Sequence, residues 1–248
     1  MLPNEAWLPA QWPAATRVHA GTTTRLAGMS RSAYASFNLA THVEDDPQAV
    51  QQNRQLLQTM LQLPNAPLWL TQVHGKVVVA AHSVSDLVAA DASFTDQANV
   101  VCAVLTADCL PVFFTDVLGR HVAIAHAGWR GLVQGIITAT LESLPVVREQ
   151  ILVWLGPGIG PTAFEVGEDV YTAFSQRDPI YAQALVRKDH DHWWLNAYVA
   201  ARLELQQAGV NAVYGGELCT YSDARRFYSY RRDHVTGRMA SLIWLAAA

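Results

Sequence analysis

Hydrophobic and polar positions along the chain follow two periods, one typical of helices and one typical of strands. Behind Asp46-Pro47, apolar residues recur every three to four positions over 49–61, which predicts an amphipathic helix with an N-cap and a proline in its first turn. Continuous apolar runs predict strands buried on both faces, and they cover 99–106, 120–125 and 150–155.

Weaker patterns predict the remaining elements. A β-branched segment over 17–24 favours a strand, and the segments 68–73 and 76–79 favour two strands around a tight turn at His74-Gly75. Further helices are expected over 131–144 and 196–208, the second followed by Gly209 at its C′ position, and late strands over 212–214, 227–230 and 240–245. Interleaved strands and helices predict an α/β (α+β) fold with mixed sheets, and the lack of a linker or repeat predicts one domain over 1–248.

Composition and charge exclude several classes of protein. Apolar residues make up 51% of the chain and charged residues 15%, with a net charge of −4, so we expect no nucleic-acid partner. No apolar run reaches the roughly 18–20 residues that a membrane helix needs, and the first residues lack the pattern of a signal peptide. Three cysteines, Cys102, Cys109 and Cys219, are too few and odd in number for a disulfide framework, so we expect free thiols in a cytoplasmic protein.

Three short segments place a His or Cys at the end of a predicted strand, beside Gly or Pro. They are Gln72-Val-His-Gly75, Thr106-Ala-Asp-Cys-Leu-Pro111 and His126-Ala-Gly-Trp-Arg-Gly131. Two His and one Cys would match a catalytic zinc site with one open position, if the fold brings His74, Cys109 and His126 together. Spacing alone leaves the alternative that all three are ordinary residues in or near the core.

The same segments, with others in order along the chain, resemble the bacterial YfiH/YlmD family, also called the laccase-domain or polyphenol-oxidase-like family. Besides 106–111 and 126–131, the segments that carry the resemblance are 156–161, 164–167, 219–221, 227–233 and 236–244. The resemblance implies a layered α/β/β/α fold and a metal, zinc rather than copper, bound by His74, Cys109 and His126 as the catalytic centre. It also implies a purine nucleoside phosphorylase that acts with phosphate on adenosine, inosine and methylthioadenosine and also deaminates adenosine.

The chain departs from the family pattern at three positions, Ala27, Glu44 and His234, where the family often has Gly. Because Gly favours positive φ, we expect altered loop geometry at residues 44 and 234. None of the three is a predicted metal ligand, so the departures bear on substrate preference.

Four further residues are candidates for substrate binding. Arg130 opens a predicted helix behind a Gly-containing turn, where phosphate is favoured, although an ion pair at an ordinary helix start is equally compatible. Arg25 and Asn38 lie in segments similar to the family's active-site loops, which implies contacts with phosphate or ribose. Glu165 is a candidate general base or supporting carboxylate, or a solvated loop residue.

The residue inventory decides against a multicopper oxidase. Such an enzyme needs about ten His, mostly in His-x-His pairs, and the chain has nine His with one such pair, His190-Asp-His192. Two other classes stay open. One is a hydrolase of the deamidase type, in which a His activates Cys109 as a nucleophile, and the other is a cell-envelope accessory protein without turnover.

Overall fold

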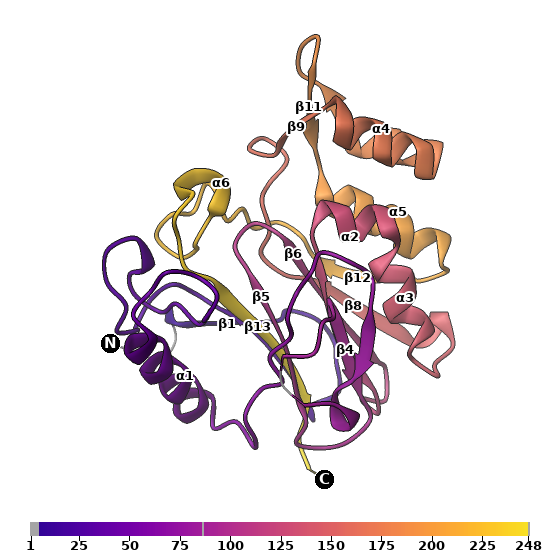
Figure 1. Cartoon of the computed structure of the whole chain (residues 1–248). Helices are drawn as coiled ribbons and strands as arrows, with labels where there is room; N and C mark the ends of the chain where they lie inside the picture. Colours follow the sequence, from indigo (N-terminus) through magenta and orange to yellow (C-terminus); the bar gives the residue numbers. More distant parts are fainter. Residues whose placement is uncertain (1–4, 86, 248) are drawn as a thin grey trace.

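Two β-sheets stack face to face at the centre of the computed structural model, which describes residues 5–85 and 87–247 (Figure 1). The first sheet is antiparallel, with strands in the order β1 (Trp7–Pro9), β2 (Val18–Thr23), β13 (Met239–Leu245) and β5 (Val101–Thr106). The second has the order β12 (Ala212–Gly215), β8 (Ile151–Leu155), β6 (Leu110–Asp116), β7 (Val122–Ala127), β4 (Ala92–Thr95) and β3 (Val78–Ala80). Its β12–β8 and β3–β4 pairs are parallel and the others antiparallel, so this sheet is mixed.

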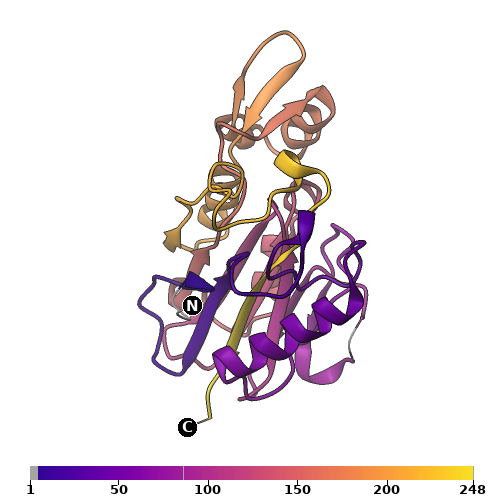
Figure 2. The ribbon, with the colours of Figure 1, turned by 90° about the vertical axis from the view of Figure 1, so that its left-hand side faces the viewer.

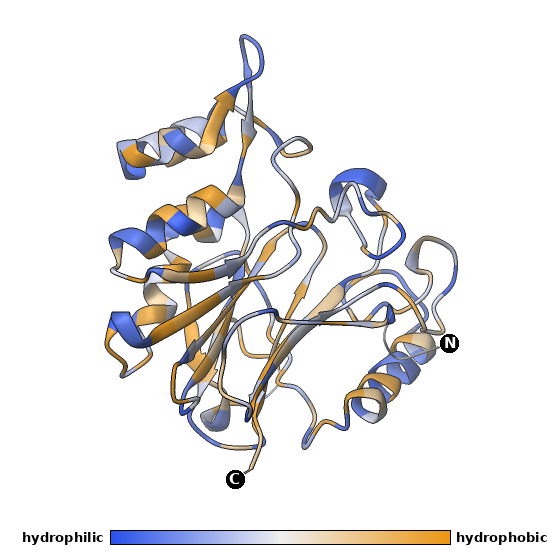
Figure 3. Ribbon diagram, turned by 180° about the vertical axis from the view of Figure 1, so that it is seen from behind, coloured by the Kyte–Doolittle hydropathy of each residue, from blue (hydrophilic) through white to orange (hydrophobic). Residues whose placement is uncertain are grey.

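Helices cover both outer faces of the stacked sheets. Helix α1 (Pro47–Leu61) packs Leu57 against the first sheet, and Figure 2 shows it in front of those strands. The second sheet is covered by α2 (Trp129–Gln134), α3 (Ile136–Glu142) and α5 (Ala197–Gln207). Apolar side chains fill the space between the sheets, among them Val104 and Ile243 against Phe113 and Ile124. The layered α/β/β/α arrangement is therefore confirmed, and Figure 3 shows the apolar positions concentrated along the central strands.

A small antiparallel sheet stands beyond the second sheet, at the top of Figures 1 and 2. It consists of β10 (Leu185–Arg187), β11 (His192–Leu195) and β9 (Glu165–Gly167), and it packs against α4 (Glu168–Arg177). One short helix, α6 (Tyr230–Asp233), precedes β13. None of the helices in the described part of the chain is long and apolar enough to cross a membrane.

Local sequence signals specify most of these elements. At α1, Asp46 accepts a hydrogen bond from the backbone N–H of Gln48 at 2.9 Å, and Pro47 occupies the first turn, as predicted. At the end of α5, Gly209 has a φ of +85°, which satisfies the left-handed C′ position. The strands predicted over 17–24, 99–106, 120–125, 150–155, 212–214 and 240–245 are confirmed as β2, β5, β7, β8, β12 and β13.

Three predicted elements differ in the structure. The helix expected over 131–144 is divided into α2 and α3 because Gly135 adopts a φ of +88°, a left-handed conformation that ends α2. Of the two strands expected around His74-Gly75, the second is present as β3, which pairs with β4, and the first is wrong. Residues 68–73 form only isolated bridges, at Leu68 and Thr71, because the backbone beyond them bends toward a buried carboxylate.

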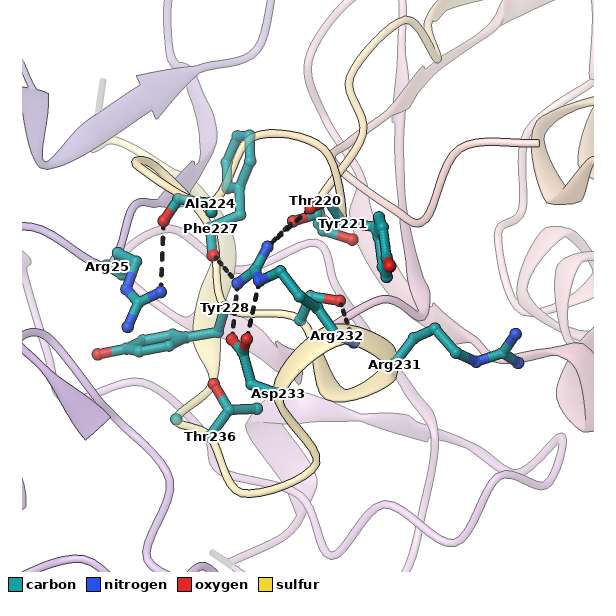
Figure 4. A network of polar contacts seen from close by, with 12 residues as sticks. Arg25, Thr220, Tyr221, Ala224, Phe227, Tyr228, Arg231, Arg232, Asp233 and Thr236 are labelled. Atoms are coloured by element: carbon teal, nitrogen blue, oxygen red, sulfur yellow. Dashed lines mark hydrogen bonds and ion pairs between the residues drawn. The ribbon is translucent and has the colours of Figure 1, made fainter. Parts of the chain in front are cut away.

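The strand expected over 227–230 is also wrong, because side chains rather than a neighbouring strand bind its backbone. Figure 4 shows the Arg232 guanidinium donating to the carbonyl oxygen of Phe227 at 3.0 Å and to that of Thr220 at 2.9 Å. The Ser229 side chain caps α6 instead, by accepting from the N–H of Arg232.

Candidate metal centre and active site

The fold brings His74, Cys109 and His126 together at one end of the second sheet. Cys109 lies directly before β6 and His126 near the end of β7, and these strands are antiparallel neighbours with Pro111 opposite His126. The start of one strand therefore meets the end of the other. His74 reaches the same point from the segment that precedes β3.

The geometry of the three side chains fits a bound metal ion. One ligand atom from each lies within 4.8 Å of the other two, and His74 Nε2 is 4.0 Å from Cys109 Sγ. The two imidazole rings are nearly perpendicular, with centroids 4.7 Å apart. Zinc bonds of about 2.0–2.3 Å place tetrahedral ligands about 3.5 Å apart, so a modest contraction closes the site. Two imidazoles and a thiolate also suit zinc chemically and leave a fourth position for a substrate.

Asp91, which precedes β4, supports both histidines. Its buried carboxylate accepts a hydrogen bond from His126 Nδ1 at 2.8 Å, which leaves Nε2 as the ligand atom of that ring. It also accepts from the backbone N–H groups of His74 at 2.9 Å and Gly75 at 2.7 Å. Burial opposes ionisation of Asp91, but these hydrogen bonds, that of His126 first, hold its pKa below the usual value. One ionised carboxylate therefore orients two of the three ligands.

Cys109 and His126 form a charge pair. Burial would raise the pKa of Cys109, but the His126 charge and hydrogen bonds from His126 and His74 outweigh it and lower the pKa to about 6. Burial likewise opposes protonation of His126, but the Cys109 thiolate and the Asp91 hydrogen bond raise the pKa of His126 to about 9. Without a metal, the pair is a thiolate beside an imidazolium at neutral pH; the thiolate is ready to attack an electrophile, and His126 must release a proton from Nε2 before it can bind a metal.

Glycine and a strained loop allow these groups to approach one another. A Cβ at Gly128 would lie 3.0 Å from His74 Cδ2 and 3.1 Å from Cys109 Sγ, so a larger residue would press on two ligands at once. Asp108 has a φ of +92°, and its carboxylate accepts from Thr220 Oγ1 at 2.6 Å and from the N–H of Arg231 at 2.7 Å. These contacts compensate for the unfavourable backbone that presents Cys109.

The three ligands line a cavity of about 580 Å³. Aromatic surface from Trp69 and Tyr230 borders it, and Gln72 lines it while bridging the N–H and carbonyl of Leu105 at 2.7 and 2.8 Å. A smaller cavity of about 140 Å³ adjoins Cys109 on the side of Trp129 and Phe164. The larger cavity has the size and the mixed lining of a small-molecule site.

Arg25 and Asn38 lie away from the lining of this cavity and bind the protein's own backbone. Arg25 donates to the carbonyl oxygens of Ala35 at 2.9 Å and Ala224 at 3.3 Å, and it stacks over Tyr228 (Figure 4). Asn38 is fully buried, and its Oδ1 accepts from the N–H of Arg238 at 2.9 Å. Their contact with substrate stays a prediction, and the contacts present stabilise the loops around the site.

Arg130 and Glu165 also lie outside the lining of the large cavity. Arg130 is exposed, with its guanidinium 4.2 Å from the ring centre of Trp129. Glu165 is paired with Lys188 and lies 3.8 Å from His192, in a shallow depression beside β9. The hydrogen bond from Lys188 lowers the pKa of Glu165. Their roles in binding substrate remain predictions.

Several residues at the site were not singled out from the sequence. His42, Arg54 and Arg238 line the large cavity, and Asp91 supports the ligands. His42 and Arg238 stand inside segments similar to the family, which was the available signal for them. Asp91 is an isolated acidic residue before a short strand, and nothing in its local pattern distinguishes it from a turn residue.

Two of the three positions where the family often has Gly have a positive φ in this structure. Ala27 has a φ of +78° and His234 a φ of +56°, so both residues carry a Cβ in a conformation that favours glycine. Glu44 is not among the residues with positive φ in the described chain.

Comparison with known proteins places the chain in a family. The profile described as multi-copper polyphenol oxidoreductase laccase matches residues 19–246. The chain belongs to this family. A curated relative named purine nucleoside phosphorylase, from Pseudomonas aeruginosa, is 49% identical over 241 residues, covering 97% of this chain and 98% of its own. Another, purine nucleoside phosphorylase YfiH from Escherichia coli, is 45% identical over 236 residues and covers 95% and 97%.

Solved structures agree in fold. The Neisseria meningitidis protein NMB0706 superimposes with a TM-score of 0.94 at 46% identity, covering 98% of this chain and 100% of that one. YlmD from Geobacillus stearothermophilus gives a TM-score of 0.90 at 30% identity, with 98% and 97% covered. The resemblance to YfiH and YlmD that the motifs indicated is therefore confirmed.

Proposed function

We propose that this protein is a zinc-dependent purine nucleoside phosphorylase that acts on adenosine, inosine and methylthioadenosine, with adenosine deamination as a second reaction. The observation that carries the proposal is the group of His74, Cys109 and His126 in the wall of a nucleoside-sized cavity. The names of the two relatives, each alignable over almost the whole chain, support the phosphorylase reaction.

Phosphorolysis requires that phosphate and nucleoside be held in one orientation. An oxygen of phosphate attacks C1′ of the ribose, the C1′–N9 bond breaks, and the purine leaves with the electron pair and takes up a proton. The products are ribose 1-phosphate and the free base. Trp69 and Tyr230 line the cavity and offer the base an aromatic surface.

Deamination uses the same cavity with water in place of phosphate. Water adds at C6 of adenine and ammonia leaves, which converts adenosine to inosine. A zinc ion held by the three ligands would supply a Lewis acid beside the substrate. Asp91 keeps His126 in one tautomer and fixes the His74 backbone, so the ligands need little rearrangement during turnover.

A second function is favoured by one observation, the lowered pKa of Cys109 beside His126. This pair could act without metal as a nucleophile and acid in a hydrolase of the deamidase type. A multicopper oxidase is not supported. The described residues bring together one group of three His, Cys or carboxylate ligands, and the whole chain has nine His.

The deciding experiment combines metal analysis with a product assay. We expect about one zinc per chain, phosphate-dependent release of adenine from adenosine and of hypoxanthine from inosine, and slower formation of inosine from adenosine. Cys109→Ala should lose most of the metal and nearly all turnover. Hydrolytic activity in the metal-free protein, abolished by a thiol alkylator, would instead support the cysteine hydrolase.

A further inference from the structure

Part of the cavity wall carries basic side chains that are not among the predicted metal ligands. His42, Arg54 and Arg238 line the same cavity as the three ligands, and none of the described residues that line it is acidic. The three come from distant parts of the sequence, namely the loop before α1, α1 itself and the segment before β13. A binding site with this charge favours an anion.

Arg238 is held in place by backbone groups and not by an acid. Its N–H donates to Asn38 Oδ1 at 2.9 Å, and its Nη1 donates to the carbonyl oxygens of Thr236 at 2.8 Å and Gly237 at 3.0 Å. Within the part of the chain that the structure describes, it forms no ion pair with a carboxylate. Arg238 is half-buried, and its guanidinium lies 5.7 Å from the ring centre of Tyr230.

Arg54 is anchored to the same loop. Its Nε donates to the carbonyl oxygen of Leu39 at 3.0 Å, and its guanidinium lies 4.2 Å from the ring centre of Trp69. His42 lies three residues after Leu39 in that loop. Asn38 and Leu39 therefore connect the two arginines: Asn38 Oδ1 accepts from the backbone N–H of Arg238, and the Leu39 carbonyl accepts from the side chain of Arg54.

The two arginines act on His42 and favour its neutral form. Burial and the charges of Arg238 and Arg54 together lower the pKa of His42, and burial lowers the pKa of Arg238. Arg238 is also within electrostatic reach of Cys109 and Asp108, so this part of the wall adjoins the predicted metal centre. An anion placed beside His42 and Arg238 would oppose this effect, because it favours the protonated form of His42.

We propose that Arg238, Arg54 and His42 form an oxyanion subsite that binds the inorganic phosphate consumed in phosphorolysis. The assignment rests on the proposed function for the identity of the anion. Guanidinium groups match phosphate oxygens with paired hydrogen bonds. The subsite places the phosphate in the same cavity as the metal centre, whereas Arg130 and Arg25 lie outside its lining.

The test compares Arg238→Gln with a matched control, Arg120→Gln. Arg120 is exposed in the turn at the far end of β6 from Cys109, so its loss changes the charge equally without touching the cavity. In Arg238→Gln we expect the apparent KM for phosphate to rise about tenfold or more, with the KM for nucleoside within about twofold of the wild type. His42→Gln, at an exposed loop position, should raise the KM for phosphate about threefold even if Arg238→Gln folds poorly.

A second readout does not depend on turnover. Inorganic phosphate alone should raise the melting temperature of the wild type and of Arg120→Gln, and this rise should be lost in Arg238→Gln. Phosphate could raise the melting temperature of the wild type but not of Arg238→Gln while the wild type phosphorolyses no nucleoside. That result would keep the subsite and reject the proposed function.

Three results would overturn the subsite. The first is an unchanged phosphate KM and melting shift in both Arg238→Gln and His42→Gln. The second is a raised phosphate KM in Arg130→Ala instead, which would return the phosphate to the start of α2. The third is an Arg238-dependent melting shift with a nucleoside monophosphate and none with inorganic phosphate, which would show that the phosphoryl group belongs to the substrate.

Discussion

At the scale of single residues, Asp91 connects chain segments that are distant in sequence. It accepts hydrogen bonds from His126 Nδ1 and from the backbone of His74 and Gly75, so it sets a ring tautomer and a loop conformation together. The protein contains a similar carboxylate at the other end of β6. Asp116 accepts from three backbone N–H groups and lies 3.1 Å from His121 Nδ1.

Because Asp116 has similar hydrogen bonds but lies away from the site, it serves as a control for a prediction about Asp91. Asp91→Asn should lower zinc affinity about 10- to 100-fold, because the amide cannot accept all the hydrogen bonds that orient the ligands. Asp116→Asn removes an equivalent carboxylate away from the site and should leave zinc affinity unchanged. Competition with a chromophoric chelator measures both, and equal losses in the two variants would reduce Asp91 to a general role in stability.

The charge pair of Cys109 and His126 predicts a pH dependence in the metal-free protein. Because the pKa of Cys109 is lowered to about 6, its thiolate forms as the pH rises through 6, and alkylation by iodoacetamide should reach half its maximal rate there. An ordinary thiol would show this rise near pH 8.5. Cys102 should not react, since burial raises its pKa to about 12.

Mass spectrometry of the alkylated protein assigns the rate to Cys109, and Cys109→Ser provides the background from Cys219. Zinc should protect Cys109 at neutral and alkaline pH, where protons do not compete for the ligands. Half-maximal alkylation of Cys109 above pH 8 would contradict the charge pair.

At the scale of elements, the antiparallel β6–β7 pair positions two ligands, and the β7–α2 junction lets them approach the third. Gly128 is the residue of that junction that faces both His74 and Cys109. Gly75, which follows His74 in the sequence, is different, because a Cβ there would meet nothing closer than Asp91 Oδ2 at 3.5 Å.

Gly128→Ala should therefore weaken zinc binding about tenfold, or by about 1.4 kcal/mol, since metal sites tolerate ligand shifts of only about 0.2 Å. Gly75→Ala should have little effect on zinc affinity. Titration of both purified variants with zinc gives the comparison, and normal affinity in Gly128→Ala would show that the ligands move aside without cost.

At the scale of the whole molecule, the packing between the two sheets holds the site together, because β5, β6 and β7 meet there. Phe113 is fully buried in this layer, with its ring centre 4.9 Å from that of Trp154. Phe113→Ala should lower the free energy of unfolding by about 3–5 kcal/mol, and Phe113→Leu by about 1–1.5 kcal/mol.

Chemical denaturation followed by both fluorescence and circular dichroism measures these losses. Both signals should change in a single transition, since the sheets share this layer. A loss below about 1 kcal/mol in Phe113→Ala would mean that the layer collapses around the gap.

Sequence patterns were sufficient to predict an element wherever residues close to it along the chain specify it. The apolar period of α1 with Asp46 and Pro47, the apolar runs of β5 and β8, and Gly209 after α5 determine those elements because capping and burial act over one or two turns. Motifs also selected His74, Cys109 and His126. Their convergence could be expected once the family resemblance was recognised.

Contacts between distant segments decided the rest. Residues 68–73 and 227–230 have strand-like composition, yet Asp91 and Arg232 bind the backbone at or beside them, and a local pattern does not contain such partners. The charged wall depends on Arg54 and Arg238, which are 184 positions apart in the numbering and meet through Asn38 and Leu39. The sequence by itself therefore determined most of the elements and selected the candidate metal ligands. Only the tertiary structure decided the supporting carboxylate and the basic cavity wall, because those depend on side chains that folding brings together.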